Sequence, residues 1–297
     1  MATERELNKR IKSIKNISQV TSALAAVSAS KASRAQRQVE ATRNYADKAF
    51  EILHNLASQP EVEHPLLTKR AEIKNAALIV VSGDRGLCGA YNTSIIQRVE
   101  TFIKAMNVPV EVITVGRKGR DLLIRRGYNV VATFDNTDSP SILRINPIAQ
   151  IITEDYLSGK VDEVFIAYTD FINLVTRYPK VKQLLPFQPL DLEGTAISDY
   201  VETFKAKEGT ESSYTYEPQP ALLLDAVVPR FTQLQIFQSV LEALASEHSA
   251  RMVAMNNATD NAAELVEILT LDRNKARQAS ITSEILDIVG GAEALAG

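Results

Sequence analysis

Cysteine and histidine, the side chains that form disulfides and zinc sites, are scarce in this 297-residue sequence. Cys88 is the single cysteine, which excludes an internal disulfide and a cysteine-rich zinc module. The three histidines lie far apart and show no HExxH-like spacing, so a zinc enzyme is not expected. They are His54, His64 and His248.

Long apolar runs are also missing. No stretch of eighteen consecutive apolar residues occurs, so we expect no segment to span a membrane by itself. The first residues lack the basic, apolar and small-residue regions of a signal peptide. A net charge of −3 argues against general affinity for nucleic acid. With 45% hydrophobic and 23% charged residues, the composition is that of an ordinary soluble globular protein.

Proline and glycine are missing from both ends of the chain. Neither residue occurs before Pro60 or between Pro229 and Gly290. Proline costs the interior of a helix about 3 kcal/mol and glycine about 1 kcal/mol relative to alanine. The sequence therefore predicts one long helix at each terminus, over residues 1–59 and 230–297.

Apolar residues in these two segments recur every three or four positions, which is the spacing of one helix face. Such a narrow stripe is typical of a two-helix coiled coil, although two separate helices packed on a globular domain are an alternative. Charge favours pairing, because residues 1–50 carry a net charge of +6 and residues 230–297 one of −4. A folded middle separates the segments, so we expect an antiparallel pair. The expected contact residues are Leu7, Ile11, Ile14, Ile17, Val20, Leu24 and Val27 in the first segment, and Leu234, Phe237, Leu241, Leu244, His248, Met252, Met255, Ala258, Ala262, Leu265 and Leu269 in the second.

Individual residues of the two helices carry further expectations. Ala26 and Ala29 belong to an alanine-rich stretch, so we expect them where two helices, or the coiled coil and a surrounding protein, approach most closely. His248 is interpreted as a structural polar residue that faces the partner helix. Gly290-Gly291 is expected to end the C-terminal helix. The residues before this pair are apolar around much of the helix and require a partner surface: Ile281, Ile285, Leu286, Ile288 and Val289.

The middle of the chain alternates between strand and helix patterns. Ala76–Ser82 (AALIVVS) is continuously apolar, as expected for a buried parallel strand. Alternating strands and helices predict a mostly parallel sheet with helices on its faces. The fourth-to-fifth link is too short for a crossover, so that pair is expected to be antiparallel. The predicted domain covers residues 70–228, with strands at 76–82, 110–115, 130–134, 163–168 and 181–187, helices at 92–106, 121–126 and 142–157, and an irregular segment at 190–217.

Two glycine-containing loops follow strands of this domain. Ser82–Gly89 (SGDRGLCG) has the position of a phosphate-binding loop but lacks the Gly-Lys-Ser/Thr ending. Val115–Gly119 (VGRKG) is not a GxGxxG motif. Both are interpreted as tight turns, and Cys88 as a small core or turn cysteine, because the sequence near it offers no histidine base. A nucleotide-binding α/β enzyme with helical arms, or a coiled-coil tether for membrane or nucleic acid, remains an alternative function.

Several motifs resemble the gamma subunit of F-type ATP synthase, and together they cover the chain in order. They are residues 245–261 (ASEHSARMVAMNNATDN), 274–292 (NKARQASITSEILDIVGGA), 11–36 and 82–92 (SGDRGLCGAYN), with Tyr216–Pro218, Leu224 and Asp225. The resemblance implies an antiparallel coiled coil joined to a Rossmann-like, mostly parallel five-stranded α/β domain. It also implies that the chain has no active site and no cofactor.

The resemblance further implies a central-stalk rotor, which couples ion-driven rotation of the membrane c-ring to conformational cycling of the catalytic beta subunits. The coiled coil would lie inside a hexamer of alternating alpha and beta subunits. The domain would contact epsilon and the c-ring, with delta in the same complex and no nucleic acid partner. The implied location is the cytoplasmic face of a bacterial inner membrane, with attachment to the membrane through the c-ring only.

Contact residues follow from the resemblance only at positions that match its motifs. The implied hexamer contacts are Lys31, Arg251, Arg277, Gln278, Thr282 and Glu284. The implied epsilon contacts are Gly86, Leu87, Cys88, Gly89 and Asn92.

Overall fold

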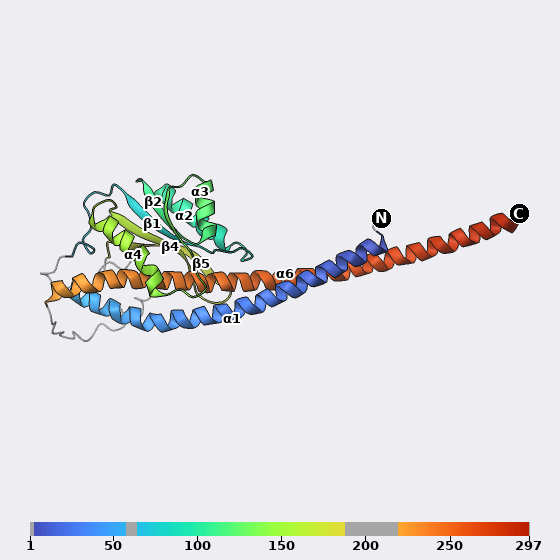
Figure 1. The fold of residues 1–297 in the computed structure, drawn as a ribbon, viewed down its shortest axis with the longest axis horizontal. Coiled ribbons are helices and arrows are strands. Elements are labelled where there is room, and N and C mark those ends of the chain that lie inside the picture. The colour runs from blue at the N-terminus through green and yellow to red at the C-terminus, as the bar shows by residue number, and fades with distance from the viewer. Residues whose placement is uncertain (1–2, 58–63, 188–218, 297) are drawn as a thin grey trace. The chain divides into compact units, whose positions relative to one another are not determined.

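The computed structural model describes residues 3–57, 64–187 and 219–296 of the chain (Figure 1). Two long terminal helices and a five-stranded sheet with three shorter helices make up these ranges. The predicted irregular segment at 190–217 and the Tyr216–Pro218 motif lie outside the described residues. The elements are α1 (Glu4–Ala57), β1 (Ala76–Val81), α2 (Tyr91–Ala105), β2 (Val110–Val115), α3 (Arg117–Arg125), β3 (Val130–Phe134), α4 (Ile142–Leu157), β4 (Glu163–Phe171), β5 (Arg177–Leu185) and α6 (Pro220–Ala296).

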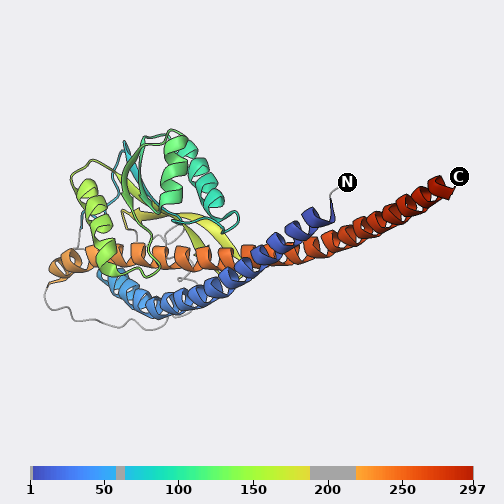
Figure 2. The same cartoon turned by 45° about the vertical axis from the view of Figure 1, so that its right-hand side comes forward.

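The sheet has the strand order β3-β2-β1-β4-β5. β1 pairs in parallel with β2 and β4, β2 pairs in parallel with β3, and β5 is antiparallel to β4, which confirms the predicted sheet. Helices α2 and α3 cover one face, and α4 and α6 cover the other (Figure 2). Because both faces are covered, every residue of the central strand β1 is buried.

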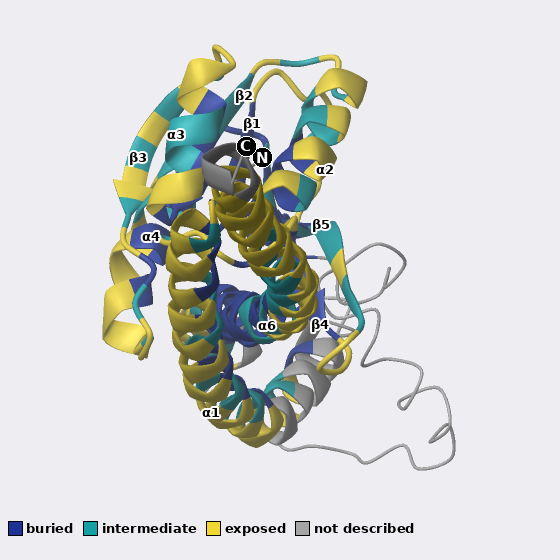
Figure 3. Cartoon of the chain, turned by 90° about the vertical axis from the view of Figure 1, so that its right-hand side faces the viewer, coloured by how far each residue is buried: buried dark blue, intermediate teal, exposed yellow. Residues whose placement is uncertain are grey.

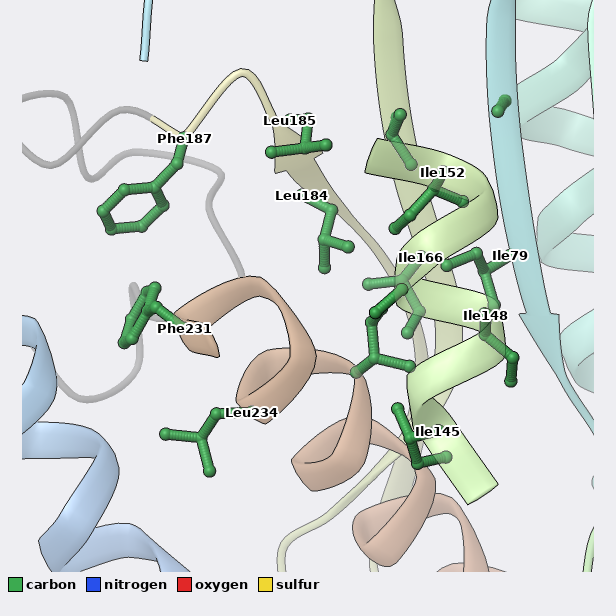
Figure 4. Packing of buried hydrophobic residues seen from close by; sticks show 14 of the residues in the cluster. Ile79, Ile145, Ile148, Ile152, Ile166, Leu184, Leu185, Phe187, Phe231 and Leu234 are labelled. Carbon is green, nitrogen blue, oxygen red and sulfur yellow. The ribbon is translucent and has the colours of Figure 1, made fainter. Parts of the chain in front are cut away.

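The larger core lies between the sheet and the pair α4 and α6. Figure 4 shows Ile79 of β1 and Ile166 of β4 on the sheet side of this cluster, next to Ile148 of α4. Phe231 and Leu234 bring α6 into the same cluster. Burial of one such side chain stabilises the fold by roughly 1.5–3 kcal/mol, so apolar packing holds α6 on the sheet.

The tight turn predicted at Val115–Gly119 is confirmed only in part. β2, β3 and α4 begin and end where the sequence predicts, but α3 begins at Arg117 instead of Asp121. Gly116 makes the turn alone with a φ of +102°, a conformation that costs glycine little. Gly119 is therefore already helical, and the interpretation of Val115–Gly119 as one tight turn was wrong beyond Gly116.

Contacts within the chain divide it into two compact units, and α1 and α6 contribute to both. Unit 1 consists of residues 1–28 and 251–297, and unit 2 of residues 29–250. In unit 1 the hydroxyl oxygens of Thr21 and Thr259 lie 2.7 Å apart. Nearer the start of α1, Arg273 donates a hydrogen bond to the Asn8 side chain at 3.5 Å. These contacts confirm the antiparallel pairing of the terminal helices.

The helix α6 departs from the predicted ends. It begins at Pro220. Proline is well suited to the first position of a helix, because the N–H that it lacks would have no partner within the helix there. Helix α6 also contains Pro229, which lies beside the buried Val228 and two residues before the buried Phe231, both in the core cluster against the sheet. The predicted end at Gly290-Gly291 was wrong, since α6 continues to Ala296. Neither glycine takes the positive φ with which glycine ends a helix.

The face of α1 that contacts α6 in unit 1 also differs from the predicted stripe. Leu7 and Ile11 are buried as expected, but Ile17, Val20 and Val27 are more than half exposed. Smaller side chains form the contact, because helices that approach closely leave little room between them. These buried residues are Thr21, Ala25 and Ser28.

Ala25 and Ala26 form a matched pair for testing this face, since Ala25 is 5% exposed and Ala26 is classed as exposed. Of the two expectations for Ala26, contact with the partner helix was therefore wrong, and contact with a surrounding protein stays a prediction. Leucine at position 25 is expected to destabilise the coiled coil by about 1–3 kcal/mol through overpacking. Leucine at position 26 is expected to leave the melting of the isolated chain unchanged. Thermal melting followed by circular dichroism measures both, and equal midpoints for Ala25→Leu and Ala26→Leu would contradict the assigned face.

Candidate functional site

The strand order reverses beside β1, where doubly wound α/β folds bind ligands in a crevice at the carboxyl ends of the strands. Helix α6 occupies this place in the present chain. The Ser246 hydroxyl donates to the carbonyl oxygen of Thr169 in β4 at 3.1 Å. The Tyr91 hydroxyl, at the start of α2, donates to the carbonyl oxygen of Ala243 at 3.0 Å. Polar groups at the carboxyl edge of the sheet therefore bind a helix.

Gly83, in the loop after β1, lies against the Glu247 carboxylate of α6. A Cβ atom at position 83 would lie 2.8 Å from Glu247 Cδ, which is closer than real Cβ contacts. In dinucleotide-binding folds a glycine of this loop lets a phosphate approach the backbone. Here a carboxylate takes that space, and its negative charge would also repel a phosphate. The Ser82–Gly89 loop therefore fits a contact with α6.

Ser82 ties together the loops that follow β1, β2 and β3. Its hydroxyl oxygen accepts a hydrogen bond from Gly119 N at 2.9 Å, and its carbonyl oxygen accepts one from Asn136 Nδ2 at 2.8 Å. Its own N–H donates to the carbonyl oxygen of Val115 at 2.8 Å. Such close approach needs glycine, because a Cβ atom at Gly116 would lie 2.1 Å from the Ser82 carbonyl oxygen. These contacts link the carboxyl ends of β1, β2 and β3 to one another.

Asp138, in the loop between β3 and α4, contacts both terminal helices within unit 2. Its Oδ2 accepts a hydrogen bond from Lys31 Nζ of α1 at 2.6 Å, and its Oδ1 lies 3.5 Å from His248 Nε2 of α6. The hydrogen bond from Lys31 is the main cause that holds the pKa of Asp138 below its ordinary value, and charges on His248 and Arg85 add to it. The structure thus places Lys31, an implied hexamer contact, and the buried His248 against a loop of the domain.

The implied epsilon contacts divide into an outer and an inner set. Gly86, Leu87 and Gly89 are exposed, and the Leu87 side chain is 64% exposed. Cys88 and Asn92 are buried, and the Asn92 side chain hydrogen-bonds to the backbone of the loop. Cys88 therefore lies in the interior of the turn, as interpreted from the sequence. The surface that this loop presents consists of its outer set.

The implied hexamer contacts of unit 1 all lie on α6. Arg251 is half-buried, whereas Arg277, Gln278, Thr282 and Glu284 are exposed. Two hydrogen bonds in this stretch stay within the helix: Thr282 donates one to the carbonyl oxygen of Gln278 at 2.9 Å, and Ser280 donates one to Glu284 Oε1 at 3.4 Å. Residues 277–290 are all exposed, and Figure 3 shows this part of α6 in yellow on the side that faces the viewer. The side chains of Arg277, Gln278, Thr282 and Glu284 are therefore accessible to another protein.

Large apolar residues of the same helix end are exposed too, as predicted. They are Ile281, Ile285, Leu286, Ile288 and Val289, whose exposed fractions run from 48% to 72%. The hydrogen bond between Asn8 and Arg273 lies close to the start of α1, so these residues extend beyond the paired region of unit 1. An apolar surface of this kind marks an interaction site.

No group of three or more His, Cys, Asp or Glu side chains in the described ranges is arranged to hold a metal ion. Among the helices of those same ranges, none is both long and apolar enough to cross a membrane.

These features define a coiled-coil subunit: two paired terminal helices, an α/β domain whose ligand crevice is taken by one of them, and a helix end exposed for a partner. The family model described as ATP synthase matches residues 3–295. The chain is 44% identical to the ATP synthase gamma chain of Chloroflexus aurantiacus, with 99% of both chains covered. It is also 44% identical to the gamma chain of Dehalococcoides mccartyi, with 86% of both covered. The chain therefore belongs to the family of ATP synthase gamma chains.

Solved structures agree on the fold. The chain is similar to a chain in the Euglena gracilis mitochondrial ATP synthase, with a TM-score of 0.64, 18% identity, and coverage of 98% of this chain and 94% of that one. It is also similar to a chain in the central stalk and c-ring of the Tetrahymena thermophila enzyme, with a TM-score of 0.59 and 22% identity. That match covers 80% of this chain and 99% of the other. At these identities the likeness concerns the fold alone.

Proposed function

We propose that this chain is the central-stalk rotor subunit of an F-type ATP synthase. It couples ion-driven rotation of the membrane c-ring to conformational cycling of the catalytic beta subunits, and it is itself non-catalytic. The observation that carries the proposal is the exposed, largely apolar end of α6 in a chain whose relatives are ATP synthase gamma chains. Such a helix end requires a surrounding protein surface.

The physical basis of coupling is asymmetry. A pair of helices has no threefold symmetry, so inside a ring of alternating alpha and beta subunits it contacts each catalytic subunit differently. Only such differential contact shifts the conformational equilibria of the three sites apart. Rotation of the helix pair then moves each catalytic site in turn through its states.

The proposed roles differ between the terminal helices and the sheet domain. The helices α1 and α6 supply the coiled coil, and the five-stranded sheet with α2, α3 and α4 supplies the domain that binds epsilon and the c-ring, with delta in the same complex. The proposed hexamer contacts are Lys31, Arg251, Arg277, Gln278, Thr282 and Glu284. The proposed epsilon contacts are Gly86, Leu87 and Gly89, with Cys88 and Asn92 holding the loop in shape.

The proposed location is the cytoplasmic face of a bacterial inner membrane, and the c-ring provides the attachment. The nucleotide-binding enzyme is the weaker hypothesis, because Glu247 and Ser246 of α6 take up the crevice in which a nucleotide would bind. The same contacts favour a domain that holds a helix.

Coexpression of the chain with alpha, beta and epsilon subunits tests the proposal. We expect the chain to copurify in substoichiometric amount with a complex that hydrolyses ATP, whereas the chain alone hydrolyses none. ATP turnover by the isolated chain that disappears in Asp84→Ala, a substitution in the Ser82–Gly89 loop, would overturn the rotor and favour the enzyme.

A further inference from the structure

We propose that torque passes between the α/β domain and the coiled coil through an interface in which three successive residues of α6 contact three different parts of the domain, one strand end and two loops. Ser246 contacts the end of β4, Glu247 the loop after β1, and His248 the loop after β3. We call this set the edge interface. The inference rests on the proposed rotor function, and it names the residues that make domain and helices turn as one body.

The geometry of an α-helix gives this arrangement its effect. Successive residues point about 100° apart around the helix axis, so residues 246, 247 and 248 point in widely different directions. Each meets a separate part of the domain, and α6 is therefore held against turning about its own axis in either sense. All three residues are buried, at 0%, 6% and 3% exposure respectively.

Apolar packing contributes to the same stop. The cluster around Phe231 and Leu234 holds α6 on the sheet, and its close-packed side chains also oppose turning of the helix. The edge interface adds a directional hydrogen bond from Ser246 and the close approach of Glu247 to Gly83.

The same interface also holds the second helix. Asp138 faces His248 of α6 with one carboxylate oxygen and accepts the Lys31 hydrogen bond of α1 with the other. One loop therefore ties both helices to the sheet. Because Ser82 fixes the loops after β1, β2 and β3 to each other, a force on one loop is shared among them.

Asp138→Asn tests the interface with little risk to folding, because the Asp138 side chain is 54% exposed. Asp121→Asn is the matched control, since Asp121 forms an ion pair of similar exposure with Arg120, at 2.7 Å, on the same domain. The assembled complex in lipid vesicles is assayed for ions pumped per ATP hydrolysed. We expect this ratio to fall for Asp138→Asn and to stay unchanged for Asp121→Asn, with ATP hydrolysis retained in both.

A distance measurement reports the stiffness of the interface directly. Spin labels on cysteines introduced at the exposed positions Ser33 of α1 and Lys104 of α2 give the distribution of distances between helix and domain. We expect Asp138→Asn to broaden this distribution in the assembled complex. A merely structural role for Asp138 would lower the yield of complex without changing the pumping ratio.

Gly83→Ala and Glu247→Ala test the contact after β1 from its two sides. The methyl group added at position 83 must push Glu247 away from the loop, so we expect a lower pumping ratio. Glu247→Ala removes the same contact and is likewise expected to lower the ratio. If Gly83→Ala fails to assemble, the Asp138 pair of variants decides.

An unchanged pumping ratio and an unchanged distance distribution in Asp138→Asn would overturn the torque interface. Failure of the unaltered chain to assemble with alpha and beta subunits would instead overturn the rotor function. The two failures are therefore distinguishable.

Discussion

Gly116→Ala is expected to destabilise the α/β domain severely. The glycine has a φ of +102°, which an L-residue with a side chain adopts only under strain. Its new Cβ atom would also lie 2.1 Å from the carbonyl oxygen of Ser82 and 2.8 Å from the Ser82 hydroxyl oxygen. Ser82 cannot retreat, because its hydrogen bonds hold three loops. Strain and overpacking together are expected to cost more than about 3 kcal/mol.

Gly127→Ala is the matched control for that substitution. Gly127 has a positive φ of +83°, but a Cβ atom there meets nothing within 4 Å. Alanine at position 127 is therefore expected to destabilise the chain only through its positive φ, by about 1–2 kcal/mol. Thermal melting of the isolated chain separates the two effects. Similar melting of Gly116→Ala and Gly127→Ala would show that the contact with Ser82 is less tight than the structure indicates.

Alanine at both Arg277 and Gln278 is expected to reduce coupled ATP synthesis strongly while the chain itself melts as before. Both residues are exposed on α6, and exposed substitutions usually change folding stability by no more than about 0.5 kcal/mol. If they contact a catalytic subunit as proposed, their loss removes polar contacts that stabilise particular rotor angles. ATP synthesis in vesicles and melting of the isolated chain are the two measurements.

The chain contains a matched control for this pair as well. Gln97 and Arg98 are adjacent, exposed residues of the same two types on α2 of the domain. Alanine at both is expected to leave synthesis and melting unchanged. A collapse of folding in the Arg277 and Gln278 variant would mean that the pair is structural and that its proposed contact is wrong.

The secondary structure was largely predictable, because its signals are local. The shortage of proline and glycine predicted both long helices, and the short link between β4 and β5 predicted their antiparallel pairing. Helix ends were harder to predict. At the start of α1, the backbone N–H of Thr3 donates to the Glu6 side chain and the backbone N–H of Glu6 donates to the Thr3 side chain. This is a capping box, and the Thr-x-x-Glu pattern predicts it.

The functional residues were only partly predictable. The exposed α6 end around Ile285 follows from a pattern that is apolar around much of the helix. Asp138 gave no signal, because a single aspartate in a polar loop is indistinguishable from a solvated one. Its importance comes from Lys31, 107 residues away, and from His248. Glu247 also gave no signal, since no local sequence pattern shows that it lies against Gly83.

By itself, the sequence determined the elements of this protein and their order, because helix breakers and strand spacing act between near neighbours. It also determined the pairing of the two ends, because the net charges of the two terminal segments are opposite. Tertiary structure alone decided which face each helix buries. Thr21 and Ala25, not Ile17 and Val20, form the contact in unit 1, because close packing of two helices selects small side chains. It also decided that the crevice of the sheet holds α6, since that depends on groups far apart in the chain meeting at one edge.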